Sequence, residues 1–291
     1  MGGYALFLGC YIPMRLPQIE VASRLALDEL GVKTKDVEGF TCCPEPWNFK
    51  GTDLLAWLKV AGRNLAVAEK KKMDILTLCN GCSATLIEAA HLLSNGGEAA
   101  REAGESLSKA GYPYKGKTKA AHAVTVLDRE LGAEKVAKSC SGNLDGLKVA
   151  VHYGCHLLRP SEVLDLDDPF EPRLLDGLVE ATGAKSVDYD NKMECCGRAS
   201  LDDKVSLGIA REKIRAMEAA GAHCVVVTCP ACFEQFDLGQ VQINRARKEK
   251  HALPVLHYFQ LLALAQGREP GELALSRHKI SVEPLLKAVK V

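Results

Sequence analysis

Ten of the twelve cysteines in this 291-residue chain fall into two series that follow the same order. Each series has a single cysteine, then an adjacent pair, then two cysteines separated by two residues. The spacings are C-x31-CC-x35-C-x2-C in the first series and C-x39-CC-x32-C-x2-C in the second. The positions are Cys10, Cys42, Cys43, Cys79 and Cys82, followed by Cys155, Cys195, Cys196, Cys229 and Cys232. Such a repeat indicates one structural unit used twice, which any fold for this chain must accommodate.

The sequence around the cysteines repeats as well. An apolar run ends in Gly-Cys at both YALFLGC (4–10) and VAVHYGC (149–155), and each run predicts a buried strand. A helical pattern, SATLIEAAHLL (83–93), follows the first C-x2-C pair. Alternating strands and helices favour an α/β fold with parallel sheets, in which ligand sites form beyond the carboxyl ends of the strands. We therefore expect the five cysteines of each copy to converge on one sheet edge, within a first domain of residues 1–145 and a second of residues 146–291.

The composition argues against several functions. Acidic and basic residues number 37 each, so there is no basic excess to attract nucleic acid or an anionic membrane surface. No apolar run approaches the roughly 20 residues that span a bilayer. The first residues, MGGYALFLGCYIP, lack the charged region of a signal peptide. We therefore expect a cytoplasmic protein without a transmembrane segment, in which so many cysteines indicate metal or redox chemistry rather than disulfides.

Five cysteines per copy are one more than the common metal sites require. Zinc takes four ligands in a tetrahedron, and conventional iron–sulfur cubanes also take four cysteines. Under either interpretation one cysteine would be spare in each copy. An iron–sulfur cluster that uses five thiolates explains the pattern directly, because thiolates are soft donors that bind in the deprotonated form. Cys140 and Cys224 lie outside the repeat, and we expect Cys224 to be buried as a small hydrophobe and Cys140 to be an incidental thiol.

The doubled pattern resembles that of the CCG-domain family of cysteine-rich proteins, and within it the family of the heterodisulfide reductase B subunits. The resemblance covers residues 4–265 and rests on FLGCYIP, TCCPEP, LTLCNGC, VHYGCHLLRPSEV, LVEATGAKSVDY, ECCG and CPACFEQFD. It implies two similar Rossmann-like CCG domains with parallel sheets, related by a pseudo-twofold internal duplication. It also implies two noncubane [4Fe-4S] clusters, each bound by the five cysteines of one series.

The resemblance implies a catalytic subunit that reduces the disulfide of coenzyme M and coenzyme B to two thiols. The implied partners are a ferredoxin-like C subunit with [4Fe-4S] clusters and a flavin-containing A subunit, in a larger electron-bifurcating complex with a hydrogenase or formate dehydrogenase. An alternative is an iron–sulfur electron-transfer subunit of a related oxidoreductase, acting on another small disulfide or in a lactate- or glycolate-type oxidase. Two departures from the family pattern are Pro44 after the first cysteine pair and RASLDD (198–203) in place of a glycine-rich segment after the second.

Three further side chains are candidates for chemistry at this site. His156 directly follows Cys155 and is the candidate proton donor, because histidine titrates near neutral pH. Its alternative role is a hydrogen bond to a cluster sulfur or a backbone carbonyl. Arg159 and Arg198 are candidates for binding an anionic group of the substrate, such as a sulfonate or phosphate, with a solvated or structural role as the alternative. His152, three residues before Cys155, is expected to be structural.

Overall fold

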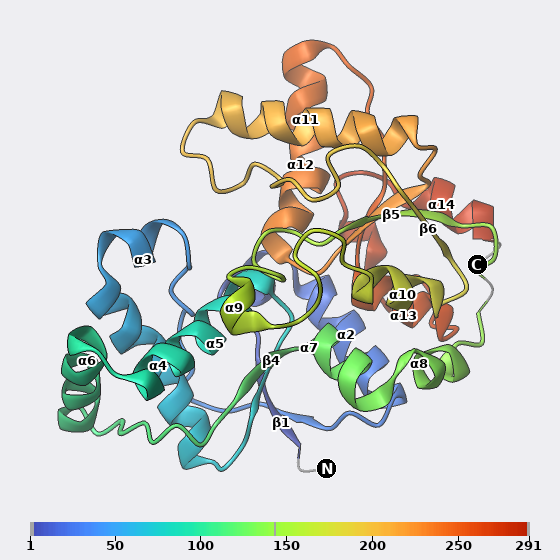
Figure 1. The fold of residues 1–291 in the computed structure, drawn as a ribbon. Helices are drawn as coiled ribbons and strands as arrows, with labels where there is room; N and C mark the ends of the chain where they lie inside the picture. The colour runs from blue at the N-terminus through green and yellow to red at the C-terminus, as the bar shows by residue number, and fades with distance from the viewer. Residues whose placement is uncertain (1–2, 143, 290–291) are drawn as a thin grey trace.

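The computed structural model describes residues 3–142 and 144–289 and contains two four-stranded parallel sheets (Figure 1). The first sheet has the strand order β2-β1-β3-β4, and the second has the equivalent order β6-β5-β7-β8. The strands are β1 (Tyr4–Phe7), β2 (Thr34–Lys35), β3 (Ile75–Thr77) and β4 (Ala120–His122), then β5 (Lys148–His152), β6 (Lys185–Val187), β7 (Cys224–Val227) and β8 (Val255–His257). The predicted α/β fold with a duplicated parallel sheet is therefore confirmed.

The central strands of the two sheets pair in the same register. Phe7 of β1 pairs with Thr77 of β3, and His152 of β5 pairs with Val227 of β7. Strands β3 and β7 are wholly buried, as expected for parallel sheets that are covered on both faces. Cys224 is fully buried at the start of β7, as predicted. The shared register allows residues of the two copies to be matched position by position.

Helices connect the strands of each sheet and cover its faces. In the first copy they are α1 (Tyr11–Arg15), α2 (Pro17–Glu29), α3 (Asn48–Thr52), α4 (Leu54–Lys70), α5 (Asn80–Asn95), α6 (Glu98–Lys109), α7 (Ala123–Val126), a π-helix (Leu127–Leu131) and α8 (Ala133–Ser139). Helix α4 begins after Asp53, whose carboxylate accepts a hydrogen bond from the N–H of Ala56 (2.9 Å). It packs against α5 and α6, and its fully buried Trp57 belongs to the core of the first copy.

The second copy repeats the arrangement with its own helices. They are α9 (Ser161–Leu164), α10 (Leu174–Glu180), α11 (Asp203–Ala219), α12 (Pro230–Arg247), α13 (Tyr258–Ala265), a 3-10 helix (Leu275–Arg277) and α14 (Glu283–Val289). Helix α11 begins after Asp202, whose carboxylate accepts hydrogen bonds from the N–H groups of Lys204 and Val205 (2.8 and 3.1 Å). It lies across α12 at the top of Figure 1.

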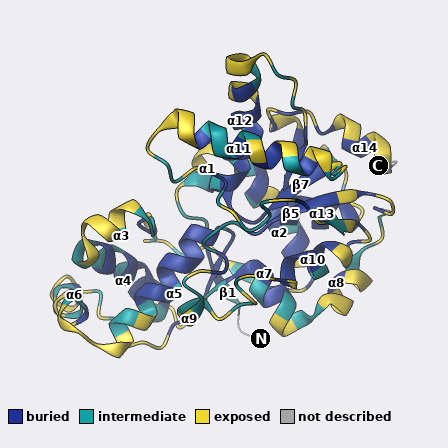
Figure 2. Ribbon diagram, turned by 45° about the horizontal axis from the view of Figure 1, so that its top comes forward, coloured by how far each residue is buried: buried dark blue, intermediate teal, exposed yellow. Residues whose placement is uncertain are grey.

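The two copies share part of their apolar core. Helix α2 of the first copy packs against α13 of the second, and every residue of α13 is buried (Figure 2). Gln266, at the end of α13, donates a hydrogen bond to the carbonyl of Ala26 in α2 (3.3 Å). This shared core fixes the orientation of one sheet relative to the other, and with it the geometry of any site between them.

Several elements could not be read from the sequence. Strands β4 and β8 have three residues each, too few to show a periodicity. The apolar run PVLHYFQLLALAQG (254–267) is typical of a single helix, but its first part is β8 and the helix begins at Tyr258. The polar segment after residue 267 contains the 3-10 helix and α14, and its Leu273 and Leu285 are buried.

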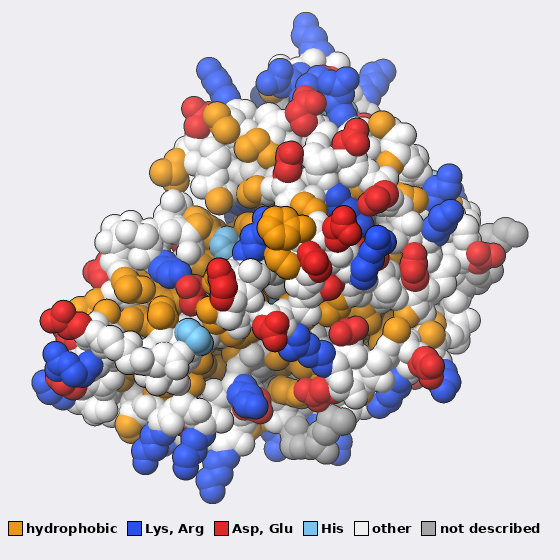
Figure 3. Space-filling view, viewed as in Figure 1, with side chains coloured by type: hydrophobic (Ala, Val, Ile, Leu, Met, Phe, Trp, Pro, Cys, Tyr) orange, Lys and Arg blue, Asp and Glu red, His pale blue; other side chains and the backbone are white. Residues whose placement is uncertain are grey.

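The surface carries both signs of charge. Acidic and basic side chains are interspersed over the face shown in Figure 3, in keeping with their equal numbers in the sequence. Among the helices formed by the described residues, none combines the length and apolar character that a membrane span would need.

The segment between the copies generates a stability prediction. Gly142→Ala is expected to lower the free energy of unfolding by about 1–3 kcal/mol, because the added methyl would lie 2.6 Å from the carbonyl oxygen of Leu264. As a control, Gly208→Ala in α11 meets no heavy atom within 4 Å. It is expected to raise the free energy of unfolding by about 0.5–1 kcal/mol, the usual cost of glycine in a helix. Urea denaturation measures both, and equal shifts would contradict the close packing at Gly142.

Candidate metal centre

The cysteines of both series lie beyond the carboxyl ends of strands, two central strands and one edge strand in each sheet. Cys10 follows β1 and Cys155 follows β5, each after a glycine with positive φ (+65° at Gly9 and +69° at Gly154). The C-x2-C pairs follow β3 and β7, where their first cysteines are the N-cap residues of α5 and α12. The adjacent pairs lie in the loops that follow β2 and β6. The local sequence therefore places equivalent cysteines at equivalent edges of the two sheets.

The structure brings the five thiols of the first series together. Cys42 hydrogen-bonds with the thiols of Cys10 and Cys43, and Cys82 hydrogen-bonds with that of Cys79. The thiol of Cys82 donates to Cys43 over 3.2 Å, far longer than the roughly 2.05 Å of a disulfide. Hydrogen bonds donated by Cys42 and Cys82 hold the pKa of Cys43 well below its usual range. The first series is thus a connected group of free thiols in which the thiolate of Cys43 is favoured, whereas hydrogen bonding and burial raise the pKa values of Cys42, Cys79 and Cys82.

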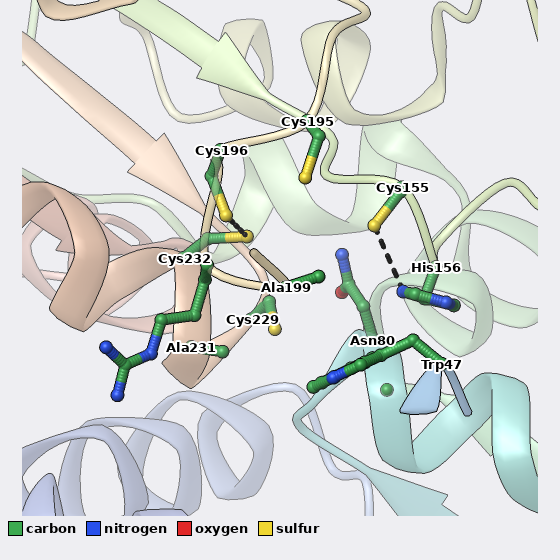
Figure 4. Close-up of a pocket in the computed structure, with 12 residues that line it drawn as sticks. Trp47, Asn80, Cys155, His156, Cys195, Cys196, Ala199, Cys229, Ala231 and Cys232 are labelled. Carbon is green, nitrogen blue, oxygen red and sulfur yellow. Dashed lines mark hydrogen bonds between the residues drawn. The ribbon is translucent and has the colours of Figure 1, made fainter. Parts of the chain in front are cut away.

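The second series forms the same arrangement (Figure 4). The sulfur atoms of its five cysteines face one common space. Cys195 hydrogen-bonds with Cys155 and Cys196, and these bonds lower the pKa of its thiol to about 2. The thiol of Cys232 donates to Cys196 over 3.4 Å and also hydrogen-bonds with Cys229. All five are free thiols.

The two groups meet between the copies. The thiols of Cys79 and Cys232 both donate hydrogen bonds to Cys229, and the pKa of Cys229 is held well below its usual range. Cys79 and Cys229 occupy equivalent positions, since each is the first cysteine of a C-x2-C pair. The ten thiols therefore form one continuous chain that crosses from one copy to the other through this contact.

The residues around the thiols fit an iron–sulfur cofactor. The donors are thiols only, which suits iron and sulfide better than it suits oxygen-preferring metals. A Cβ at Gly9 would lie 2.9 Å from the sulfur of Cys82, and one at Gly154 would lie 3.4 Å from that of Cys232. Glycine leaves room at both places for the backbone to approach the sulfurs closely.

Hydrogen bonds cross between the copies to hold the loops that carry the cysteines. His122, at the end of β4, lies with Nε2 3.1 Å from the carbonyl oxygen of Thr228, just before Cys229. Its Nδ1 accepts from the N–H of Val124 (3.2 Å), so Nε2 carries the proton and donates. Burial lowers the pKa of His122 to about 3, which keeps the ring neutral.

The second copy makes the equivalent contact with a cysteine loop of the first copy. His257, at the end of β8, lies with Nε2 3.1 Å from the carbonyl oxygen of Leu78, just before Cys79. Burial lowers the pKa of His257 to about 4. Asn80 adds two further contacts, donating to the carbonyl of Tyr153 (2.7 Å) and accepting from the hydroxyl of Thr228 (2.8 Å). Each copy thus positions the cysteine loop of the other.

A small pocket opens beside the second series and is lined by both copies. Trp47 and Asn80 come from the first copy, and His156 and Arg198 come from the second. Nδ1 of His156 lies 3.0 Å from the sulfur of Cys155, and its ring centroid lies 5.3 Å from that of Trp47. Burial lowers the pKa of His156.

The two candidate arginines lie in different places. Arg198 lines the pocket, and its guanidinium donates to Glu234 (3.1 Å) and to the hydroxyl of Tyr11 (3.4 Å). Arg159 is absent from the lining of this pocket and donates instead to the carbonyl of Pro169 (2.8 Å). The geometry therefore favours Arg198 for contact with a ligand in this pocket and gives Arg159 no part in it.

Comparison with known proteins agrees with this geometry. The family model described as "Cysteine-rich domain" (CCG) matches residues 4–87 and 149–237, and each range contains one complete series. The B subunit of the ferredoxin/F(420)H(2)-dependent CoB-CoM heterodisulfide reductase from Methanosarcina acetivorans is 42% identical over 100% of this chain and 98% of its own. The chain belongs to the heterodisulfide reductase B-subunit family of CCG proteins. Membership of this family, with its clustered cysteines, indicates an iron–sulfur oxidoreductase role.

Two further similar proteins extend the comparison. The 8-methylmenaquinol:fumarate reductase membrane anchor subunit from Wolinella succinogenes is 32% identical over 97% of this chain and 98% of its own. A crystal structure of a hypothetical protein from Helicobacter pylori has a TM-score of 0.75 at 15% identity, over 96% of this chain and 52% of that one. At that identity the likeness to the solved structure shows the fold alone.

Sequence reasoning missed the side chains that cross between the copies. His122 and His257 occur in AAHAV (120–124) and VLHYF (255–259), so a histidine stands at the same place in both repeats. That recurrence was a usable signal, but it lies outside the cysteine motifs. Asn80 lies inside a C-x2-C motif, where nothing in the sequence indicates contact with the other copy.

We predict that His122→Phe loosens the cysteine loop of the opposite copy. The buried carbonyl of Thr228 would lose its donor, which is expected to lower the free energy of unfolding by about 1–3 kcal/mol. After iron is removed with a chelator, Cys229 and Cys232 should react faster with a thiol reagent than in the unmodified protein. Mass spectrometry of labelled peptides measures this.

The equivalent substitution in the second copy is expected to loosen the cysteine loop of the first copy. In His257→Phe, Cys79 and Cys82 should label faster, because the carbonyl of Leu78 loses its donor. His91→Phe, at an exposed position of α5, serves as the control. Faster labelling confined to the copy that carries the substitution would contradict the cross-copy role.

Proposed function

We propose that the chain is the catalytic subunit of a heterodisulfide reductase, which reduces the disulfide of coenzyme M and coenzyme B to two thiols. The observation that carries the proposal is the meeting of two complete five-thiol groups through Cys79 and Cys229. The relatives named as B subunits of CoB-CoM heterodisulfide reductases support this substrate.

We assign one noncubane [4Fe-4S] cluster to each series, with all ten cysteines as ligands. Splitting a disulfide into two thiols consumes two electrons and two protons. Bound clusters would supply electrons one at a time, which suits a substrate that gains one electron at each sulfur. The pocket between the copies, with walls from both, is the place we propose for the disulfide.

Two side chains of the pocket are assigned to the substrate. His156 is the proposed proton donor, since it lies in the pocket beside Cys155 with one ring nitrogen toward that sulfur. Arg198 is the proposed contact for an anionic group of the disulfide, with Glu234 and Tyr11 orienting its guanidinium. Arg159 remains a weaker candidate, because it lies outside this pocket.

The names of the relatives support a multi-subunit complex, and the partners proposed for it come from the family resemblance. Those proteins are named as one subunit of a reductase, which implies a complex, and we propose a ferredoxin-like C subunit and a flavin-containing A subunit as neighbours of this chain. A hydrogenase or formate dehydrogenase would supply electrons to the larger assembly. A cytoplasmic location is part of the same proposal.

A second candidate function is electron transfer within a different oxidoreductase. The similarity to the 8-methylmenaquinol:fumarate reductase subunit favours it, because that relative keeps 32% identity over nearly the whole chain. A lactate utilization protein A from Bacillus anthracis is also related, at 23% identity over 89% of this chain. Under this alternative the pocket would take another small disulfide, or the chain would only relay electrons.

Iron analysis and turnover test the first proposal. The purified protein should hold about eight irons per chain, the content of two four-iron clusters. With reduced viologen as donor it should reduce the coenzyme M–coenzyme B disulfide anaerobically. Cys195→Ser should lower turnover by at least about tenfold, given that even residues outside the ligand set change activity by 10–100-fold. Cys140→Ser, outside both series, should leave turnover unchanged.

The outcomes separate the two candidate functions. Stoichiometric zinc in place of iron would contradict both. Full iron content without disulfide reduction, together with electron transfer to a quinone analogue or from lactate, would favour the relay function.

We predict that Arg198→Gln raises the KM for the disulfide. The loss of a charge-assisted hydrogen bond to an anionic group is worth up to about tenfold at a partly exposed site. Arg159→Gln is the matched control and should leave KM unchanged, because Arg159 lies outside the pocket. Steady-state kinetics over a range of disulfide concentrations measures both, and a larger effect from Arg159→Gln would reverse the assignment.

A further inference from the structure

The two thiol groups have different surroundings at two matched positions. His152 is the last residue of β5 and lies three residues before Cys155. Its counterpart in the first copy is Phe7, the last residue of β1 and three residues before Cys10. An imidazole therefore stands beside the second group where a hydrocarbon ring stands beside the first.

The ring of His152 has no hydrogen-bond partner among the protein atoms. The residue is 1% exposed, and neither ring nitrogen makes a hydrogen bond within the described chain. A ring nitrogen of His152 and the sulfurs of Cys196 and Cys232 all lie within 4.8 Å of one another. The neutral form of the ring carries one N–H and the charged form carries two, so an N–H is present in either state. A buried N–H without a partner is costly, and the ligand sulfurs are the acceptors beside it.

The first copy has no such donor at the matched position. Phe7 is fully buried and packs edge-on against Phe40, with ring centroids 5.0 Å apart. A phenyl ring cannot donate a hydrogen bond to sulfur. This position therefore adds an N–H to the second group only.

A second pair of matched positions adds a positive charge near the second thiol group. Asn64 is the eleventh residue of α4, and Lys213 is the eleventh residue of α11. Both side chains are fully buried. The amide of Asn64 donates to the carbonyl of Cys42 (3.0 Å).

Lys213 holds the equivalent loop of the second copy with an ammonium. It donates to the carbonyl oxygens of Asn191 and Lys192, in the loop before the adjacent cysteines. The charge faces the thiols of the second group, namely Cys195, Cys196 and Cys232. Glu194 also faces it, but that residue is exposed, so solvent screens its charge. Because a neutral amide holds the first loop equally well, the loop itself does not require a cation.

We propose that His152 and Lys213 make the second site the more oxidising of the two, so that a single electron resides preferentially on a cluster bound there. The inference rests on the proposed function, in which each series holds one cluster. Added electron density on a cluster is stabilised by N–H donors to its sulfurs and by nearby positive charge. The second site has both, and the matched positions of the first site have a phenyl ring and a neutral amide.

Potentiometric titration of the intact, iron-loaded protein, followed by EPR, tests the proposal. Two separate one-electron steps are expected. His152→Phe, which installs the residue of the first copy, should move the upper step to lower potential and leave the lower step in place. The electron distribution should shift at least tenfold toward the first site, which is 59 mV for a one-electron couple.

Substitutions of the lysine provide an independent measurement. Lys213→Gln keeps a hydrogen-bond donor for the loop but removes the positive charge. It should move the upper step to lower potential. Lys213→Arg keeps the charge and should leave it near its original value. The reverse change, Phe7→His, should raise the lower step by placing an N–H beside the first group.

Iron content separates failure of this inference from failure of the proposed function. Fewer than about eight irons in the unmodified protein would contradict the assignment of two four-iron clusters itself. Full iron content with coincident steps, or movement of the lower step in His152→Phe, would overturn the difference in potential. If His152→Phe does not retain iron, the Lys213→Gln and Lys213→Arg pair decides the outcome.

Discussion

The contact between the thiols of Cys79 and Cys229 is the interaction on which the geometry of the site depends. It requires the carboxyl edges of two separate parallel sheets to face each other. Packing of α2 against α13 sets that orientation in the core, and the crossed hydrogen bonds of His122 and His257 set it at the edge. One copy alone would keep its five cysteines but would lose the histidine that holds their loop. Duplication is therefore a structural requirement of this site.

The convergence of the cysteines could be predicted because it depends on local sequence. A strand followed by Gly-Cys, or by C-x2-C at a helix start, places sulfur at the sheet edge whatever surrounds it. The placement of Arg159 and Arg198 could not be predicted in this way, since both lie in loops whose course depends on distant partners. The guanidinium of Arg159 is held by the Pro169 carbonyl, whereas that of Arg198 is held by Glu234 on α12. Closeness in sequence to a ligand cysteine was therefore a good guide for Arg198 and a poor one for Arg159.

Elements of three residues, and contacts between the copies, were also beyond the sequence. Strands β4 and β8 are too short to show a periodicity, yet each ends in the histidine that crosses to the other copy. Helix α13 is apolar on every side because it is buried between the copies, and such a pattern does not indicate its partner. The packing of α2 against α13 is therefore seen only in the tertiary structure.

The segments that follow the two cysteine pairs differ in length. The 17-residue helix after each pair, α4 in the first copy and α11 in the second, begins at a different distance from the pair. Helix α4 starts eleven residues after Cys43, but α11 starts seven residues after Cys196, and RASLDD (198–203) spans most of that shorter connection. The shorter connection brings α11 against the second pair, where a Cβ at Gly197 would lie 2.5 Å from the carbonyl oxygen of Ser206. Glycine is required there, with φ +91°, whereas the first pair is followed by Pro44, whose carbonyl accepts from Thr85 (2.8 Å). Lys213 lies on α11, so the helix that makes Gly197 necessary also carries the buried charge to the second group. The shorter flank and the buried charge of the second group thus both involve α11, whereas His152 lies on β5.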